Sequence, residues 1–427
     1  MRNYEGDMPY NNYDEPRQRK TTRKKKKTKS NLFFSDFIAK NPADLTLTLL
    51  VIGLSVIGLI EILSSSYYNA IQAQNDGLYF FKKQLLFFCI GLVFMFIASK
   101  INFNVYKNLA APILYYGSLV LLVYVLLRGD TFLGATRWIE IGPISFQPSE
   151  FAKIGLILFL ALQLSMRKPE QEYEPKEKLK FWQRIGHSLK IYKKELIFII
   201  IPVFLIGVEN WSTAIVLFVT AIVMLYISGF RIDKCVPSFL ILLVLFIAFI
   251  KIGGIGWLKS LDIADGKYNK RLQRFETWLD PFSDPLDTGY QTVQSLYAIG
   301  SGGISGVGLG KSKQKLGYIP LSYNDMIFTI ICEEFGFFGA LVIVVIFITL
   351  IVKCIKIAMR CTNKFALYYT VGMTSLIALQ VIVNIGVVTG ALPNTGMPLP
   401  FISYGGTALM MELIGMGIVL SISRYQE

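Results

Sequence analysis

Apolar residues in this chain gather into long runs instead of alternating with polar ones. Each run is about 20 residues long, the length that an α-helix needs to cross the core of a bilayer. The runs predict an all-α, polytopic membrane protein with about ten transmembrane helices. Their approximate bounds are 44–66, 83–99, 108–127, 150–166, 195–208, 212–228, 236–256, 326–352, 366–389 and 406–423.

Composition agrees with this pattern. Of the 427 residues, 53% are hydrophobic and 17% are charged, whereas a soluble domain carries about 25% charged residues. The polar segment before the first run lacks the apolar stretch of a cleavable signal peptide, so we expect the first run to stay as an anchor. The five cysteines lie in or beside apolar runs without paired spacing, and we expect neither disulfides nor a zinc site.

The distribution of the net charge of +14 predicts an orientation. With the amino terminus in the cytoplasm, 29 of the 43 lysines and arginines fall on the cytoplasmic side, as the positive-inside rule requires. We expect a basic cytoplasmic tail at 1–43, followed by a membrane domain at 44–427. The basic run 17–29 is interpreted as a solvated tail attracted to anionic lipid, with partner docking as the alternative and no nucleic acid expected. His187, in the cytoplasmic connection 167–194, is interpreted as incidental.

Two connections on the opposite, extracellular side are long, at 128–149 and 257–325. Long loops in compact proteins tend to carry function. If the chain performs chemistry, these large extracellular loops are the expected place.

The segment 134–153 ends where the fourth run begins. Pro148 suits the first turn of a helix, and Glu150 favours its positive end. Lys153 follows on the same face, at a depth where a charge needs a partner or a polar cavity. Two interpretations stay open: a Glu150–Lys153 pair that anchors the helix, or Lys153 and Arg137 as cations for a phosphate-bearing ligand.

Asp325 is the last ionisable residue before the eighth run. Partial removal from water would raise the proton affinity of its carboxylate, which suits a general base. The alternative is an ordinary acid at a helix start. Glu333 and Glu334 lie deeper in the same run and must face the interior, either to hold helices together or to join the site.

Glycine and proline mark two further segments. Glycines between 300 and 310 permit tight bends near a ligand, but no strand precedes them and no GK[ST] follows, which excludes a dinucleotide fold and a P-loop. Residues 390–406 contain three prolines and four glycines, so we expect a shaped loop over the mouth of the bundle. That loop is either a structural plug or a direct substrate contact.

Together these segments resemble the SEDS family, the shape, elongation, division and sporulation proteins that include RodA, FtsW and SpoVE. The matching strings are TRWIEIGPISFQPSEFAK (136–153), DPLDTGYQTVQSLYAIGSGGISGVGLGKSKQKLGYIP (284–320), NDMIFTIICEEFG (324–336) and LPNTGMPLPFISYGG (392–406). Their order and spacing cover nearly everything after residue 44.

The resemblance implies a peptidoglycan glycosyltransferase that polymerises lipid II at the outer face of the cell membrane, for cell elongation, division or sporulation. It implies a class B penicillin-binding protein as partner, with other divisome or elongasome membrane proteins. It also implies that Asp325 is catalytic. We predict substrate contacts from six further residues: Arg137, Gln147, Glu150, Lys153, Gln294 and Ser295.

The chain departs from the family pattern at two places. The family usually has LPExHTDFIF where this chain has IPLSYNDMIF, which replaces an acid at Leu321, a histidine at Tyr323 and a threonine at Asn324. Where the family often has QPDLGTA, this chain has VENWSTA, with Asn210 at the usual aspartate and Glu209 beside it. A charge-dependent role for that aspartate therefore does not carry over, unless Glu209 substitutes.

These expectations combine into one mechanism. Asp325 takes the proton from the 4-hydroxyl of the acceptor sugar as that oxygen attacks the anomeric carbon of a second lipid-linked disaccharide, with inversion. Arg137 and Lys153 stabilise the departing undecaprenyl pyrophosphate. A divalent cation, Mg²⁺ or Mn²⁺, is a further candidate for that role, and no organic cofactor is expected. The alternatives are a lipid II flippase and a scaffold for cell-wall synthesis.

Overall fold

The computed structural model of the chain describes residues 41–128, 130–132, 135–141, 144–167, 191–230, 274, 276–287 and 289–425. Within these residues the prediction of an all-α, multi-pass architecture is confirmed. Seven helical segments of the described part are long and apolar enough to cross a membrane. They are α2 (Leu45–Gln74), α3 (Tyr79–Lys100), Phe103–Arg128, α6 (Pro148–Ser165), α14 (Ile327–Met359), α15 (Lys364–Val388) and α16 (Gly406–Ser423).

Each predicted span that falls on described residues coincides with a helix. The segment Phe103–Arg128 is built from α4 (Phe103–Val105), a π-helical turn at Tyr106–Ala110 and α5 (Ala111–Arg128). Two predicted spans are shorter than the rest, α8 (Lys193–Glu209) and α9 (Trp211–Ile227), with 17 residues each. The predicted span 236–256, the tail before residue 41 and His187 lie outside the described residues.

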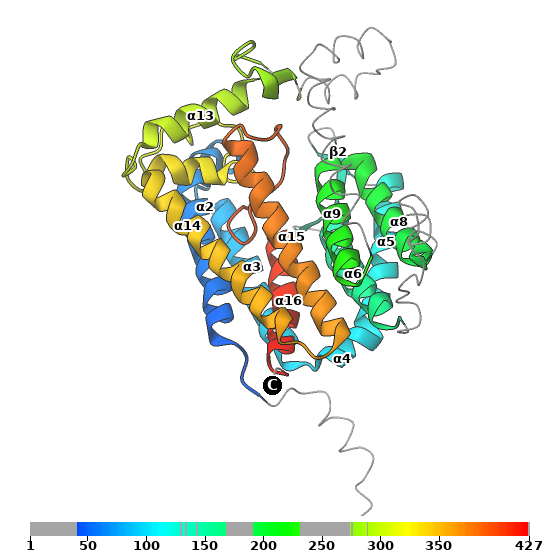
Figure 1. Cartoon of the computed structure of the whole chain (residues 1–427). Coiled ribbons are helices and arrows are strands. Elements are labelled where there is room, and N and C mark those ends of the chain that lie inside the picture. The colour runs from blue at the N-terminus through cyan, green and yellow to red at the C-terminus, as the bar shows by residue number, and fades with distance from the viewer. Residues whose placement is uncertain are drawn as a thin grey trace, which may run out of the picture. The chain divides into compact units, whose positions relative to one another are not determined.

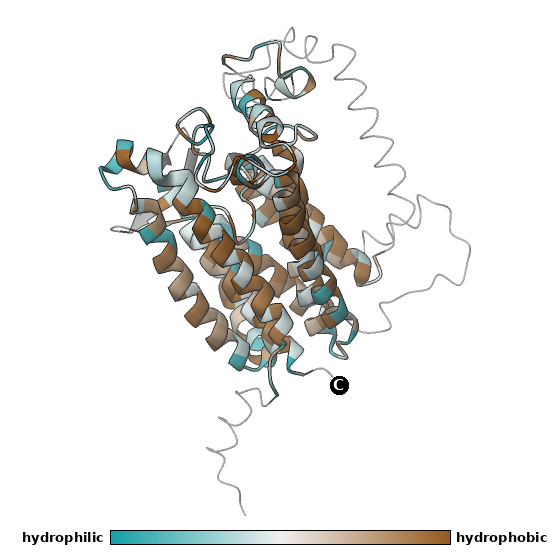
Figure 2. Cartoon of the chain, turned by 90° about the vertical axis from the view of Figure 1, so that its left-hand side faces the viewer, coloured by the Kyte–Doolittle hydropathy of each residue, from teal (hydrophilic) through white to brown (hydrophobic). Residues whose placement is uncertain are grey.

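The helices pack side by side, and α6 is the most enclosed of the seven long ones (Figure 1). It contacts α5, α8, α15 and α16, while α3 lies along α16 and α2 contacts α3 and α14. Hydrophobic residues run along the middle of the helices and hydrophilic residues collect at their ends (Figure 2). A polar side chain on α6 must therefore find its partners within the protein.

One end of the bundle, at the top of Figure 1, carries the features that the sequence assigned to the extracellular side. Helices α6 and α14 begin there and α15 ends there; we call it the site end. The segment 128–149 forms an antiparallel sheet of β1 (Asp130–Phe132), β2 (Ala135–Ile141) and β3 (Ile144–Phe146), in the order β1-β2-β3. Within 257–325 lies the helix α13 (Tyr290–Gly302).

The sequence predicted these two segments only as long connections and did not locate the strands and the helix within them. Strands of three residues are too short to show an alternating pattern, and β2 gains its hydrogen bonds only by pairing with both neighbours. Helix α13 is short and less apolar than the spans, so it does not appear in a search for membrane-length runs. By contrast, the prediction of an irregular 390–406 segment is confirmed, because residues 389–405 form a loop without helix or strand.

Helix α14 bends at Gly336, where φ is 65°. The chain that follows α13 fits into the bend: the Val307 amide donates to the Glu333 carbonyl at 3.0 Å, and the Phe337 amide donates to the Gly303 carbonyl at 2.9 Å. A Cβ atom on Gly336 would lie 2.4 Å from a main-chain nitrogen of that segment. Both the φ angle and the close approach therefore require glycine here.

Candidate functional site

Asp325 lies in the turn that leads into α14, at the site end. Its side chain is partly buried, and its backbone carbonyl accepts a hydrogen bond of 2.7 Å from the Asn384 side chain on α15. Burial raises the pKa of the Asp325 carboxyl to about 6, against the opposing effect of the positive charge of Arg274. A carboxylate with this pKa is mostly ionised at neutral pH, yet it accepts a proton more readily than an ordinary aspartate.

Hydrogen bonds join the elements that lie next to the turn of Asp325. The Ser295 hydroxyl on α13 bonds to the Thr329 hydroxyl of α14 at 2.7 Å and donates to the Val388 carbonyl of α15 at 2.8 Å. The Asn394 amide of the 389–405 loop donates to the Gln291 side chain of α13 at 2.9 Å. These contacts join α13, α14, α15 and the loop to one another beside the turn that carries Asp325.

Glu333 and Glu334 hold the segment after α13 against α14. Lys315 forms a buried ion pair of 2.7 Å with Glu334 and also donates to the Ser64 hydroxyl of α2 at 2.9 Å. Glu333 accepts a hydrogen bond of 2.9 Å from the Lys313 amide and another from the Ser312 hydroxyl. The sequence left two roles open for Glu333 and Glu334, to hold helices together or to join the site. These contacts agree with the first role.

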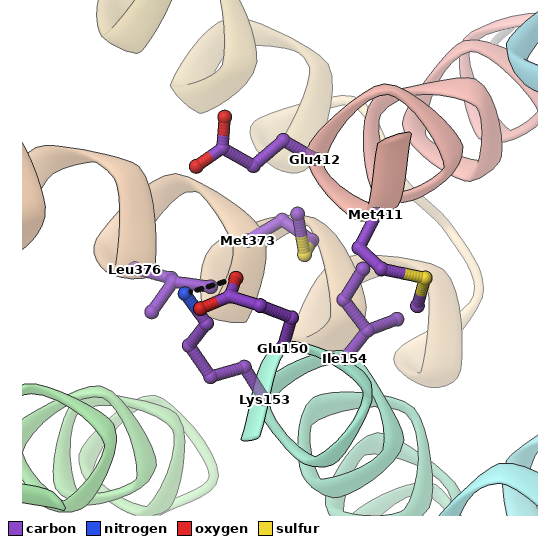
Figure 3. Close-up of a pocket in the computed structure, with 7 residues that line it drawn as sticks. All are labelled: Glu150, Lys153, Ile154, Met373, Leu376, Met411 and Glu412. Carbon is purple, nitrogen blue, oxygen red and sulfur yellow. Dashed lines mark ion pairs between the residues drawn. The ribbon is translucent and has the colours of Figure 1, made fainter. Parts of the chain in front are cut away.

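A second polar cluster lies deeper in the bundle, around a small cavity between α6, α15 and α16 (Figure 3). Lys153 forms an ion pair of 2.6 Å with Glu150, and both side chains are almost fully buried. Glu412 of α16 lies across the cavity from this pair (Figure 3). The lining is otherwise apolar, with Ile154, Met373, Leu376 and Met411. Lys153 is therefore paired with Glu150, and the carboxylate of Glu412 lines the same cavity.

Local sequence explains why α6 presents this pair. Pro148 is at the first position of the helix and Glu150 is in its first turn, as predicted. Glu150 and Lys153 are three residues apart, so they lie on one face. The predicted Glu150–Lys153 pair is thus present in the structure, while a phosphate contact by Lys153 stays a prediction.

The remaining predicted substrate residues occupy varied positions. Gln147 precedes α6 and is half-buried, Gln294 is half-buried on α13, and the Ser295 hydroxyl is already engaged between helices. Arg137 lies on β2, and its side chain is outside the described residues. At the departure from the family pattern, Asn210 caps α9 by accepting the Thr213 amide at 3.2 Å. Substrate contact by Arg137, Gln147, Gln294 and Ser295 stays a prediction.

Sequence reasoning missed two charged residues at the site. Arg274 precedes the WLDP string and acts on the Asp325 carboxylate through its charge. Glu412 lies in the last apolar run, where an isolated acid is itself a signal of function. That signal is visible in the sequence alone.

Comparisons with known proteins agree with this geometry. Residues 45–427 match the Cell cycle protein family of FtsW, RodA and SpoVE. Stage V sporulation protein E of Bacillus subtilis (strain 168) is 36% identical over 390 residues, which are 91% of this chain and 99% of that protein. The probable peptidoglycan glycosyltransferase FtsW of Geobacter sp. (strain M18) is 34% identical over 382 residues, 89% of this chain and 96% of that protein.

Solved structures also resemble this chain. One belongs to a peptidoglycan synthase complex that coordinates polymerization and crosslinking; it has a TM-score of 0.69 and 26% identity, and the match covers 90% of this chain and 99% of the other. The rod shape determining protein RodA of Thermus thermophilus has a TM-score of 0.60 at 24% identity, with 90% and 98% covered. The second likeness supports the fold alone.

Proposed function

The chain belongs to the FtsW, RodA and SpoVE family of cell cycle proteins, and from this premise we propose that it is a peptidoglycan glycosyltransferase. It polymerises lipid II into glycan strands, for cell elongation, division or sporulation. The observation that carries the proposal is the partly buried Asp325 at the site end, beside the hydrogen bonds that join α13, α14, α15 and the 389–405 loop. The likeness to a probable peptidoglycan glycosyltransferase supports this class of reaction.

In this mechanism Asp325 is the general base. Its carboxylate accepts the proton of the acceptor 4-hydroxyl while that oxygen forms a bond to the anomeric carbon of a second lipid II molecule. The bond from that carbon to the pyrophosphate breaks, and undecaprenyl pyrophosphate leaves with the electron pair. The single displacement inverts the anomeric centre. The raised pKa of Asp325, about 6, supports this role, because the group is ionised and basic near neutral pH.

The departing pyrophosphate requires positive charge. Lys153 and Arg137 remain the proposed cations, and the effect of Arg274 on Asp325 adds a third. Lys153 is enclosed with Glu150 and Glu412, so its contact with a phosphate requires the cavity to widen. Among the described residues no three acidic, histidine or cysteine side chains converge to hold a metal ion, so this part of the chain offers no group of ligands that fits the proposed Mg²⁺ or Mn²⁺.

We further propose the orientation and the partner. The amino terminus and the tail 1–43 lie in the cytoplasm, and the membrane domain 44–427 places its site end outside, as the positive-inside rule predicts. A class B penicillin-binding protein binds the chain laterally within the membrane, together with other divisome or elongasome proteins. The likeness to a chain of a peptidoglycan synthase complex supports this partner.

Polymerisation of labelled lipid II by the purified full chain tests the function. The reaction is run in vesicles with and without a candidate class B penicillin-binding protein, and glycan strands are separated by electrophoresis. We expect strands that are absent when Asp325→Asn replaces the wild type. Transport of lipid II is measured in the same vesicles: transport without polymer under either condition would favour the flippase alternative and refute the transferase.

A further inference from the structure

Glu412 is a charged side chain in the core of the bundle that has no role in the mechanism above. It lies on the second turn of α16 and is 7% exposed. One carboxylate oxygen accepts the backbone amide of Phe401, in the 389–405 loop, at 2.8 Å. The carboxylate thus joins α16 to the loop that packs against Asp325.

The point of attachment is a constrained backbone. Phe401 has a φ of 63°, a left-handed conformation that a bulky residue adopts only when its surroundings hold it there. Its ring is buried, at 2% exposed. Helix α2 presses on the same turn, because a Cβ atom on Gly58 would lie 2.7 Å from the Phe401 carbonyl oxygen. Glu412 therefore holds one side of a turn that α2 confines from the other.

Four residues before Phe401 the loop reaches the site. The Asn384 side chain donates to the Met397 carbonyl at 2.8 Å and to the Asp325 carbonyl at 2.7 Å. A Cβ atom on Gly396 would lie 3.4 Å from Asp325 Oδ2, so this part of the loop borders the carboxylate itself.

The connection between these two points is stiff. The sequence from Met397 to Phe401 is MPLPF, and each proline fixes its own φ near −65° and restricts the residue before it. The turn is closed by the Ser403 hydroxyl, which accepts the Leu399 amide at 2.8 Å. A displacement of Phe401 is therefore transmitted to Met397 instead of being absorbed between them.

The other neighbour of Glu412 is the proposed phosphate-binding cation. The carboxylate lines the same cavity as Lys153 and Glu150 and interacts electrostatically with both. An anion that reaches Lys153 meets the negative charge of Glu412, so the charge of Glu412 opposes anion binding there.

We propose that Glu412 is a positioning residue for the reaction at Asp325: it fixes the 389–405 loop through Phe401 and links that loop to Lys153. This inference rests on the proposed function. It assigns two separable effects to one carboxylate, an acceptor that holds the loop and a charge that lowers the affinity of Lys153 for an anionic substrate.

Two substitutions separate the effects. Glu412→Gln keeps an oxygen that accepts the Phe401 amide but removes the charge, whereas Glu412→Leu removes both. Met410→Leu is the control, because Met410 is on the same helix beside Gly91 of α3 and has no contact with the loop among the described hydrogen bonds. Each full-length variant is compared by hydrogen exchange of the peptide 397–405 and by the kinetics of lipid II polymerisation.

We expect Glu412→Leu to raise the exchange rate of the peptide about tenfold and to lower kcat by a similar factor, because a buried amide loses its acceptor. Glu412→Gln should retain the protection and kcat of the wild type and lower KM a few-fold. Met410→Leu should match the wild type. The proposal would be overturned if Glu412→Leu kept the protection and the kcat of the wild type. It would also be overturned if Glu412→Gln and Glu412→Leu lost protection and kcat equally. An inactive wild type would refute the transferase instead, and the exchange data would still test the loop contact.

Discussion

Replacing Asp325 by asparagine tests the proposed base with little change of shape. The backbone carbonyl of residue 325 keeps its hydrogen bond from Asn384, and the side chain keeps its size, but the amide cannot accept the proton. General base catalysis contributes about 10²- to 10⁴-fold, so the polymerisation rate should fall by at least about 10²-fold. The variant should fold and insert like the wild type.

The pH dependence gives a second, quantitative signature. Because the reaction needs the ionised carboxylate and the pKa of Asp325 is about 6, activity should rise with pH through that value. The ionised fraction is about 90% at pH 7 and about 10% at pH 5, so the rate should fall about tenfold between them. An aspartate with an ordinary pKa near 3.8 would remain ionised over this range.

The assay measures initial rates of labelled lipid II polymerisation from pH 5 to pH 8. Asp287→Asn is the matched control, since Asp287 is an exposed acid in the same connection. Circular dichroism melting confirms that each variant is folded. A wild-type rate for Asp325→Asn would refute the assignment of the base. So would an inflection near pH 6 that persists in the residual activity of that variant, because the titrating group would then lie elsewhere.

Further substitutions test the rest of the structure. Lys153→Ala should reduce polymerisation by weakening the stabilisation of the pyrophosphate, and Lys153→Arg should retain part of the rate; full activity of the alanine variant would contradict the role. Lys315→Met should lower the free energy of unfolding by about 3–5 kcal/mol, because Glu334 is left as an unpaired buried charge. The double variant with Lys315→Met and Glu334→Gln should recover much of the melting temperature. Cysteines placed in 257–325 should react with an impermeant thiol reagent on intact cells and those in 167–194 should not; the reverse pattern would refute the orientation.

The sequence predicted the elements that depend on long patterns. Apolar runs located the described spans, since a membrane helix is specified by length and composition alone. It also placed Glu150 and Lys153 on one face of α6, because a spacing of three residues has a fixed geometry in a helix. The position of Asp325 at the start of α14 followed from the same logic.

Contacts between distant segments were not predictable in this way. Nothing local indicates that Ser295 bonds to Thr329 and Val388, because the pairing depends on how α13 packs across two other helices. The glycines after α13 were interpreted as bends near a ligand, yet Gly303 and its neighbours meet the bend at Gly336. Glu412 gave a signal by its isolation, but only the fold shows that it faces Lys153 and holds Phe401.

The single amide of Asn384 affects how genetic screens on this protein are interpreted. Its nitrogen joins the carbonyls of Asp325 and Met397, so a change at Asn384 disturbs the position of the base without touching a reacting atom. A screen that scores growth alone would place Asn384 and Asp325 in the same class of intolerant positions. Intolerance in such a screen therefore identifies residues that build the site as readily as the one that performs the chemistry.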